Sequence, residues 1–512
     1  MEALTAQRTY AKLVGLSQHT RALTSVSQLL EWDQETYMPP GAIEARAIQH
    51  KVLAGVIHKE KTGRPFKEAL CSLIDLETGS IIASGLHEQQ RRALYWWRHD
   101  YLRDKALPIR FVEELSQLSS QAINIWRIAR KKSDFTLFAP ILERIVDYCR
   151  RKADLIGYKD HPYDALVDEF EPEMTTKELM LLFDEMGSAI QSLVKAIRAT
   201  APVDDSFLHN SFLEKKLLSF SHLLLETIGY DFSKGRLDLS THPFSTSMHP
   251  TDSRVTTRIG KHGLMNCLSA TLHEGGHSLY EMGLPLEGWG TPLGSSVSLG
   301  IHESQSRWWE TYIGLSRPFW EYFFPLLQDY FPEFNNISLE AFYRAINKVE
   351  PSFIRVEADE VTYPLHILLR FTIERQLIEG SIKVSEVPDM WNSLMQELLG
   401  ITPVNDAQGC LQDIHWSMGA FGYFPTYALG NMYAGQLFKA FTNHHLNWAE
   451  RLAKGECNFI RDWLHQHIFR YGRQFASHSL IELATKQPCS AGFYIAYLHK
   501  KYSAIYPLHY HA

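Results

Sequence analysis

The 512-residue chain contains only six cysteines, and no two of them form a Cys-x-x-Cys pair. They are Cys71, Cys149, Cys267, Cys410, Cys457 and Cys489. Scattered cysteines of this kind are typical of reduced, mostly buried thiols rather than of a disulfide framework. The pattern therefore favours a cytoplasmic protein over a small, disulfide-stabilised secreted one.

Long apolar runs, long basic runs and internal repeats are absent too. No stretch of about 18 apolar residues occurs, so no membrane span is expected. The start of the chain, Met1 to Arg8, lacks the basic-then-apolar order of a signal peptide. The net charge of −7 disfavours nucleic acid as the main partner. Without repeats or a long linker, residues 1–512 are predicted to form one domain, with or without two lobes around a cleft.

Helical periodicity dominates what the sequence does contain, so the predicted fold class is mostly α. Helices are expected over Leu4–Trp32, Glu88–Leu107, Phe111–Arg130 and Ala139–Ile156. Thr175 and Glu178 have the spacing of a capping box and predict the start of another helix.

Strand signals are few. Arg236–Ser240 and Arg254–Ile259 alternate or carry β-branched residues on either side of a Pro/Ser-rich turn. They are predicted to pair as a small hairpin. The hairpin would come just before a helix over about Gly263–Met282, which Gly283 and Pro285 are expected to end.

The most informative stretch lies inside that helix: His273-Glu274-Gly275-Gly276-His277. Two histidines four residues apart share one face of a helix, so both rings can reach one metal ion. Glu274 leaves the helix at another angle and can hold a water beside that metal. This spacing is typical of hydrolytic zinc sites. The alternative is a surface helix with two histidines and a solvated glutamate.

Gly275 and Gly276 bear on whether the helix that carries the two histidines is intact. Each costs about 1 kcal/mol in a helix interior relative to alanine. Their presence indicates that something packs closely against the backbone, such as a neighbouring helix or a substrate chain. The alternative is a broken helix, in which case the histidine spacing has no meaning.

A catalytic zinc usually has three protein ligands and one open position. Tyr280 stands where a metzincin would have glycine, which excludes that class. Glu281 is too far along the helix to share the metal. Glu303, on a second helix after the loop Gly283–Ser296, is the better third ligand, unless it is a surface glutamate. His302 is expected to orient a ligand instead.

A second group of candidates lies later in the chain. His415 with Tyr423 or Tyr427 can donate hydrogen bonds to an oxyanion, although the segment from Leu411 to Tyr427 also fits an aromatic core. Arg355 can bind a free carboxylate through its planar guanidinium. A structural salt bridge between Arg355 and Asp359 is an equally good interpretation.

Taken together, several segments resemble the carboxypeptidase Taq family of metallopeptidases. The matching stretches, in the family's order, are Trp32–Gly41, His242–Phe244, Asp252–Arg258, the His273–His277 motif, Ile301–Arg307, Ile354–Asp359 and Gly409–Trp416. They span nearly the whole chain, so the match is far more specific than the metal motif alone.

The resemblance implies a large helical fold akin to neurolysin and angiotensin-converting enzyme, with a deep substrate groove. It implies a homodimeric metallocarboxypeptidase that removes single C-terminal residues from peptides with broad specificity, disfavouring proline. Carried over by position, His273, His277 and Glu303 would bind zinc, or cobalt in some members. Glu274 would be the catalytic base, and Arg355 and the His415–Tyr423 region would contact the substrate.

Two other functions compete with this one. An oligopeptidase would cut short peptides internally with the same metal chemistry. A helical binding protein would carry the motif without a metal and catalyse nothing.

Overall fold

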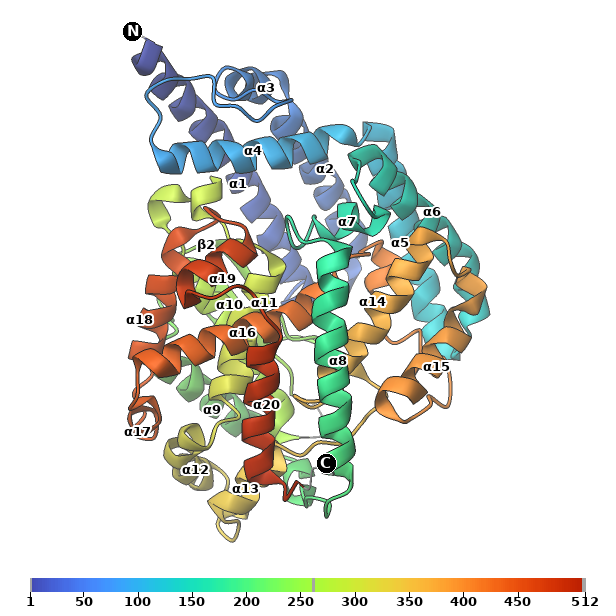
Figure 1. Cartoon of the computed structure of the whole chain (residues 1–512), viewed down its shortest axis with the longest axis vertical. Helices are drawn as coiled ribbons and strands as arrows, with labels where there is room; N and C mark the ends of the chain where they lie inside the picture. Colours follow the sequence, from blue (N-terminus) through green and yellow to red (C-terminus); the bar gives the residue numbers. More distant parts are fainter. Residues whose placement is uncertain (1, 260–262, 509–512) are drawn as a thin grey trace. The chain divides into compact units, whose positions relative to one another are not determined.

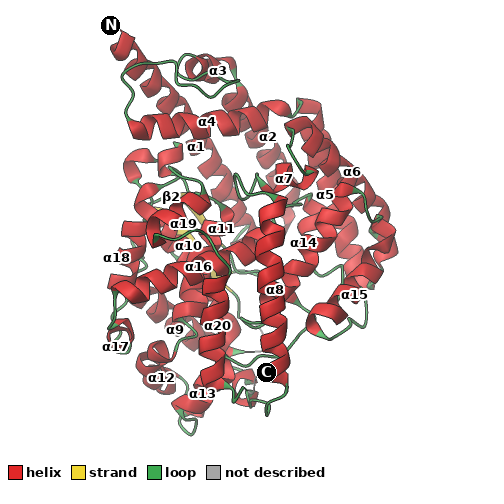
Figure 2. Cartoon of the chain, viewed as in Figure 1, coloured by secondary structure: helices red, strands yellow, loops and turns green. Residues whose placement is uncertain are grey.

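The computed structural model describes residues 2–259 and 263–508. The fold is mostly α with one small sheet, which confirms the predicted fold class (Figures 1 and 2). The chain forms two compact units, each built from three segments. Unit 1 comprises Met1–Lys105, Asp205–Tyr343 and Ala440–Pro488; unit 2 comprises Ala106–Asp204, Arg344–Lys439 and Cys489–Ala512. A single catalytic domain over the whole chain stays a prediction.

The helices of unit 1 are α1 (Glu2–Thr36), α2 (Ile43–Thr62), α3 (Arg64–Cys71), α9 (Glu214–Ile228), α10 (Leu264–Met282), α11 (Leu299–Arg307), α12 (Arg317–Tyr330), α17 (Trp448–Leu452), α18 (Asn458–His467) and α19 (Ser477–Thr485). Those of unit 2 are α5 (Ile109–Lys132), α6 (Ala139–Ile156), α7 (Pro162–Val167), α8 (Thr176–Arg198), α14 (Tyr363–Glu379), α15 (Val387–Leu399) and α20 (Gly492–Ile505). Three helices cross a boundary between the units: α4 (Glu88–Ala106), α13 (Leu339–Ile346) and α16 (Phe424–His444).

The helices predicted in the first third of the chain are confirmed as α1, α4, α5 and α6. The capping box before α8 is confirmed as well. The Thr175 hydroxyl accepts a hydrogen bond from the Glu178 backbone N–H at 3.2 Å. The Glu178 carboxylate in turn accepts from the Thr175 N–H at 3.0 Å, so two unpaired donors at the helix start are satisfied.

The small sheet has three strands in the order β1-β3-β2: β1 (Leu237–Leu239), β2 (Ser245–His249) and β3 (Asp252–Thr257). The predicted hairpin between Arg236–Ser240 and Arg254–Ile259 is wrong. These strands do pair, but in parallel, with Leu237 opposite Val255. The antiparallel partner of β3 is β2, which lies inside the segment predicted to be a turn. A tight turn joins only adjacent antiparallel strands, and here it joins β2 to β3.

The metal-motif helix α10 packs against α9, α11 and the sheet. Its leucines Leu264, Leu268, Leu272 and Leu279, at close to helical spacing, are buried. The helix ends at Met282, and the Gly283 N–H bonds the carbonyl of Leu279 at 3.1 Å. The helix and its C-terminal stop are therefore as predicted.

The two glycines of the motif face different neighbours. A Cβ at Gly275 would lie 2.6 Å from Cδ2 of Leu225 and 3.2 Å from Cδ1 of Ile228, both on α9. A Cβ at Gly276 would lie 2.5 Å from the carbonyl oxygen of Gln305 and 2.8 Å from Cα of Ser306, both on α11. The expected close packing against a neighbouring helix is confirmed. At Gly276 the contact is with the backbone of the helix that carries Glu303.

This difference predicts unequal effects of two substitutions. Gly276→Ala forces α11 away from α10, because a backbone carbonyl cannot move independently, and is expected to lower the free energy of unfolding by about 1–3 kcal/mol. Gly275→Ala meets only the ends of flexible side chains, and its better helix propensity of about 1 kcal/mol offsets part of the clash. Denaturant unfolding of both variants measures the difference. Equal destabilisation would contradict the assignment of the closer contact to Gly276.

Candidate metal centre

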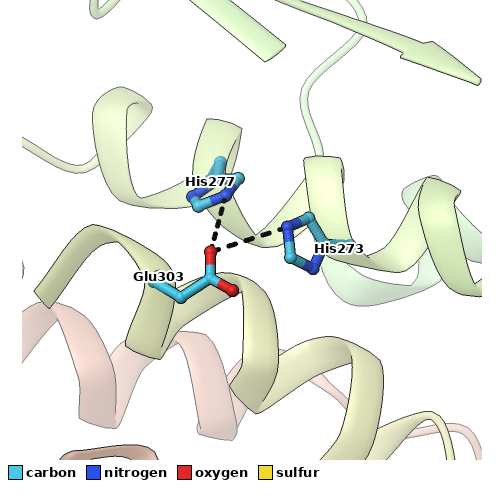
Figure 3. A group of neighbouring side chains, drawn as sticks. All are labelled: His273, His277 and Glu303. Atoms are coloured by element: carbon cyan, nitrogen blue, oxygen red, sulfur yellow. Dashed lines mark ion pairs between the residues drawn. The ribbon is translucent and has the colours of Figure 1, made fainter. Parts of the chain in front are cut away.

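His273 and His277 on α10 and Glu303 on α11 converge on one point (Figure 3). Oε2 of Glu303 lies 3.5 Å from Nε2 of His277 and 3.7 Å from Nε2 of His273. One ligand atom from each of the three residues lies within 4.8 Å of the others. The structure thus brings together the three residues predicted to bind a metal.

The spacing of these atoms fits a shared cation better than direct hydrogen bonds. Ligands about 2.0–2.2 Å from a tetrahedral zinc lie roughly 3.3–3.6 Å from one another. Direct N–H···O hydrogen bonds would bring the atoms to roughly 2.7–3.2 Å. The donor set of two imidazoles and one carboxylate therefore fits a divalent metal in both chemistry and geometry.

The opposite ring nitrogens of both histidines are held by other side chains. Nδ1 of His273 lies 2.8 Å from a carboxylate oxygen of Glu310. Nδ1 of His277 lies 2.5 Å from Nδ1 of His302, and Nε2 of His302 lies 3.0 Å from Glu281. These contacts turn both Nε2 atoms towards Glu303. Such outer hydrogen bonds orient metal-binding histidines and set which nitrogen is free.

Glu310 is a further functional candidate that was not predicted from the sequence. It lies on a π-helical turn, Trp308–Ile313, that directly continues α11, and it also accepts a hydrogen bond from Nη1 of Arg307 at 2.8 Å. The only signal in the sequence is its separation of seven residues from Glu303, about two helical turns. The π-helical turn shifts the helical phase, so the spacing alone could not show where Glu310 points.

Burial and neighbouring charges move the pKa values of the two central groups in opposite directions. Burial lowers the pKa of His273, but the carboxylates of Glu303 and Glu310 more than offset this and raise it to about 9. Burial raises the pKa of Glu303, whereas His273 and His277 more than offset this and bring it to about 2. Glu303 is therefore ionised at neutral pH, as a metal ligand must be.

Glu274 has a different environment from Glu303, although both carboxylates are buried. Burial is the largest effect on Glu274 and raises its pKa above the ordinary value. A hydrogen bond with Ser245 on β2 and the nearby His273 lower it only in part. The small sheet thus reaches the side chain predicted to act as the base.

In unit 2, Arg355 lies in a short 3-10 turn, Arg355–Glu357. Its Nη2 and Nε donate to Asp413 at 2.8 Å and 3.1 Å, and its Nη1 donates to the Tyr363 hydroxyl at 3.1 Å. The alternative salt bridge with Asp359 is wrong. Asp359 instead accepts from the backbone N–H and hydroxyl of Thr362 at the start of α14.

Arg370 on α14 binds the same carboxylate, through Nε to the other oxygen of Asp413 at 2.7 Å. Asp413 and Arg370 were not predicted as site residues, although Asp413 lies only two positions before His415. Two guanidinium groups on one carboxylate leave an excess positive charge in a buried place. Such a charge favours an anionic ligand.

His415 and the two tyrosines predicted with it lie together. Nε2 of His415 is 3.2 Å from the Tyr427 hydroxyl, and its ring centroid is 5.2 Å from that of Tyr423. The Tyr427 ring also lies 4.9 Å from the guanidinium carbon of Arg355. Burial lowers the pKa of His415 to about 4, so the ring is neutral at pH 7. The predicted substrate residues thus form one cluster in unit 2, and the predicted metal ligands form another in unit 1.

Among the helices of the described residues, none combines the length and apolarity needed to cross a membrane.

Comparison with known proteins gives one consistent result. A profile of the family described as Carboxypeptidase Taq (M32) metallopeptidase matches residues 12–502. The thermostable carboxypeptidase 1 of Thermus thermophilus is 39% identical over 98% of this chain and 100% of its own length. Carboxypeptidase 1 of Bacillus subtilis is 40% identical over 94% of this chain and 95% of its own.

Solved structures agree. The crystal structure of the M32 carboxypeptidase from Deinococcus radiodurans R1 is similar with a TM-score of 0.94 and 34% identity, covering 98% of this chain and 100% of that one. The Pyrococcus furiosus carboxypeptidase gives a TM-score of 0.92 and 33% identity, covering 96% and 99%. The chain therefore belongs to the carboxypeptidase Taq (M32) family of metallopeptidases and is a metallocarboxypeptidase.

Proposed function

We propose that His273, His277 and Glu303 hold the catalytic metal and that Glu274 is the general base for release of single C-terminal residues from peptides. The observation that carries this proposal is the convergence of two Nε2 atoms and one carboxylate oxygen beside a buried glutamate. We further propose that the metal is zinc, with cobalt as a substitute, because borderline-soft ions suit imidazole and carboxylate together.

The metal, when bound, supplies a Lewis acid that polarises the scissile carbonyl and makes water more acidic. The protein's own contribution is the base. Glu274 accepts a proton from the attacking water and passes it to the leaving amine nitrogen. Its raised pKa makes it a stronger base than an exposed glutamate, which favours the first of these transfers.

Arg355 is proposed to bind the substrate's free C-terminal carboxylate. The excess charge that it shares with Arg370 around Asp413 supports this role, because a buried guanidinium pair attracts an anion. His415 and Tyr423 are proposed to donate hydrogen bonds to the oxyanion that forms during hydrolysis. The neutral state of His415 supports donation from a ring N–H without a net charge.

The same charge favours exopeptidase over internal cleavage, because an internal peptide segment brings no carboxylate to Arg355. A metal-free binding protein is not favoured, since it has no need for paired imidazoles aimed at one carboxylate. Broad specificity that disfavours proline, and a deep substrate groove, remain proposals that rest on the family. A cytoplasmic location is supported by the six cysteines, all of which are free thiols.

The first prediction concerns the base. Glu274→Gln keeps the size of the side chain but cannot accept the proton, so kcat is expected to fall by about 10²–10⁴-fold. Bound zinc, measured by elemental analysis, is expected to stay near one per chain, because the three ligands are unchanged. Product mass spectrometry on a peptide pool, with chelator-treated and zinc-restored parent enzyme as controls, measures activity. A variant that keeps most of its activity would overturn the assignment of Glu274.

The second prediction concerns the free C-terminal carboxylate of the substrate. A peptide with an amidated C-terminus is expected to be cleaved about 10–100-fold less efficiently than its free acid, because Arg355 loses a charge-assisted hydrogen bond. Comparing kcat/KM for the matched pair measures this. Arg355→Met should remove the difference between the two peptides. Equal cleavage of both peptides by the parent enzyme would support the oligopeptidase alternative.

The third prediction concerns assembly into a homodimer. One face of α2 exposes Ile48, Val52 and Val56 at 65%, 60% and 40%, one helical turn apart. An apolar stripe of this kind on a solvent-exposed surface supports an interface with a second copy of the chain.

Light scattering is expected to give a dimeric mass for the parent protein. Val52→Glu is expected to weaken the dimer by at least ~10-fold, because it places a charge without a partner in the interface. Leu181→Glu, at an equally exposed leucine on α8, serves as the matched control. A parent protein that is monomeric at micromolar concentration would contradict the proposal.

A further inference from the structure

Glu374 is a fully buried carboxylate on α14 that the reaction scheme above does not use. Three donors surround it. Its Oε2 accepts from the Tyr163 hydroxyl at 2.6 Å and from the Gly422 backbone N–H at 2.9 Å. Its Oε1 accepts from Nε1 of Trp416 at 2.9 Å.

Two of these donors are next in sequence to the residues predicted to donate to the oxyanion. Trp416 directly follows His415, and Gly422 directly precedes Tyr423. One carboxylate thus fixes both ends of the stretch between these residues. Gly422 is held on its other side as well, because its φ is +94° and a Cβ there would lie 2.6 Å from the carbonyl carbon of Leu166 on α7.

The position of Glu374 is costly for a purely structural residue. All three donors are neutral groups, and Arg370, one turn earlier on α14, binds Asp413. A buried carboxylate without a bonded cation is unfavourable, because removal from water penalises its charge. Burial accordingly raises the pKa of Glu374 to about 7, even though its three hydrogen bonds and Arg370 lower it.

A carboxylate is the only side chain that satisfies this arrangement. It presents acceptor oxygens to Gly422 and Trp416 at once, in opposite directions. Glutamine has one oxygen and one NH₂ group. In either orientation of the amide, an N–H therefore faces another N–H, at Gly422 or at Trp416.

We propose that Glu374 is a positioning residue that places His415 and Tyr423 for peptide hydrolysis by holding both ends of the segment between them. The proposal rests on the substrate roles given to His415 and Tyr423 above. Glu374 itself touches no substrate in this scheme and acts only through those two side chains.

The test compares Glu374→Gln with Glu171→Gln. Glu171 is also fully buried in unit 2, and its carboxylate accepts from the Tyr433 hydroxyl at 3.0 Å. Glu374→Gln is expected to lower kcat by about 10–100-fold, the scale of a displacement of about 1 Å in a reacting group. Bound metal should be unchanged. Both variants are expected to lower thermal stability to a similar extent. Glu171→Gln is expected to leave kcat within about twofold, because most single-site effects outside active sites act on stability alone.

A double-mutant cycle separates positioning from general damage. In a His415→Phe, Tyr423→Phe background, Glu374→Gln is expected to have little further effect on kcat, since the residues that it positions are gone. An undiminished effect in that background would overturn the proposal. So would an unchanged kcat in the parent background. If His415→Phe and Tyr423→Phe alone leave kcat and KM unchanged, the substrate roles themselves fail, and this result is visible without any variant of Glu374.

Two further measurements guard against a variant that does not fold. Trp416→Phe keeps an aromatic side chain but removes one of the three donors, and it is expected to lower kcat by several-fold with KM little changed. The near-neutral part of the pH profile of kcat is expected to shift in Glu374→Gln, because ionisation of Glu374 overlaps there with that of the metal-activated water. The titratable groups facing Glu374 are Tyr163 on α7, Cys149 on α6 and Arg370 on α14, and burial or ion pairing keeps their ionisation away from neutral pH. The same near-neutral profile in both proteins would contradict the assignment.

Discussion

The backbone contact between α10 and α11 at Gly276 is the constraint on which the metal centre depends. The space beside Gly276 is taken by the carbonyl of Gln305 and Cα of Ser306, so no side chain separates the helices there. Glu303 lies only two residues before Gln305, and its short side chain reaches both histidines of α10 from this distance. A wider separation would leave the carboxylate out of range of a shared cation. Gly276 is therefore required by the geometry of the site. Gly275 only leaves room for side chains of α9.

The two clusters are electrostatic opposites. Around the histidines of unit 1 lie the carboxylates of Glu303, Glu310 and Glu281, a surplus of negative charge that suits a divalent cation. Around Asp413 of unit 2 lie two guanidinium groups, a surplus of positive charge that suits a carboxylate. Each cluster is incompletely neutralised by its own side chains. In the function proposed above, a metal ion and the C-terminal carboxylate of a peptide supply the charges that complete them.

The sequence predicted best where the relevant interactions are local. Helix periodicity and capping depend on residues three and four apart, so α1, α4, α5, α6 and α10 were found close to their observed limits. The pairing of β1 with β3 was predicted, but its parallel direction was not, because β2 is polar and its place as the antiparallel partner of β3 has no clear signal in the sequence. Arg355 and Asp359 show the same limit. Their spacing of four residues suggests an ion pair only on an α-helix. Arg355 lies in a 3-10 turn, and its true partner, Asp413, is 58 residues away. Glu310 was not predicted for a related reason, since a π-helical turn changes which residues share a face.

Three buried glutamates differ in pKa because the groups around them differ. Glu303 faces two histidines, and these bring its pKa to about 2 despite burial. Glu274, one residue after His273, has burial as its largest effect, so its pKa is raised and it can take up a proton. The three donors bonded to Glu374 are neutral, and burial outweighs both their hydrogen bonds and the nearby Arg370, which brings its pKa to about 7. Burial pushes all three in the same direction, so the difference lies in which groups each carboxylate faces. The same logic supports the proposed roles of the three residues as metal ligand, general base and positioning residue, because charge and geometry differ at each site.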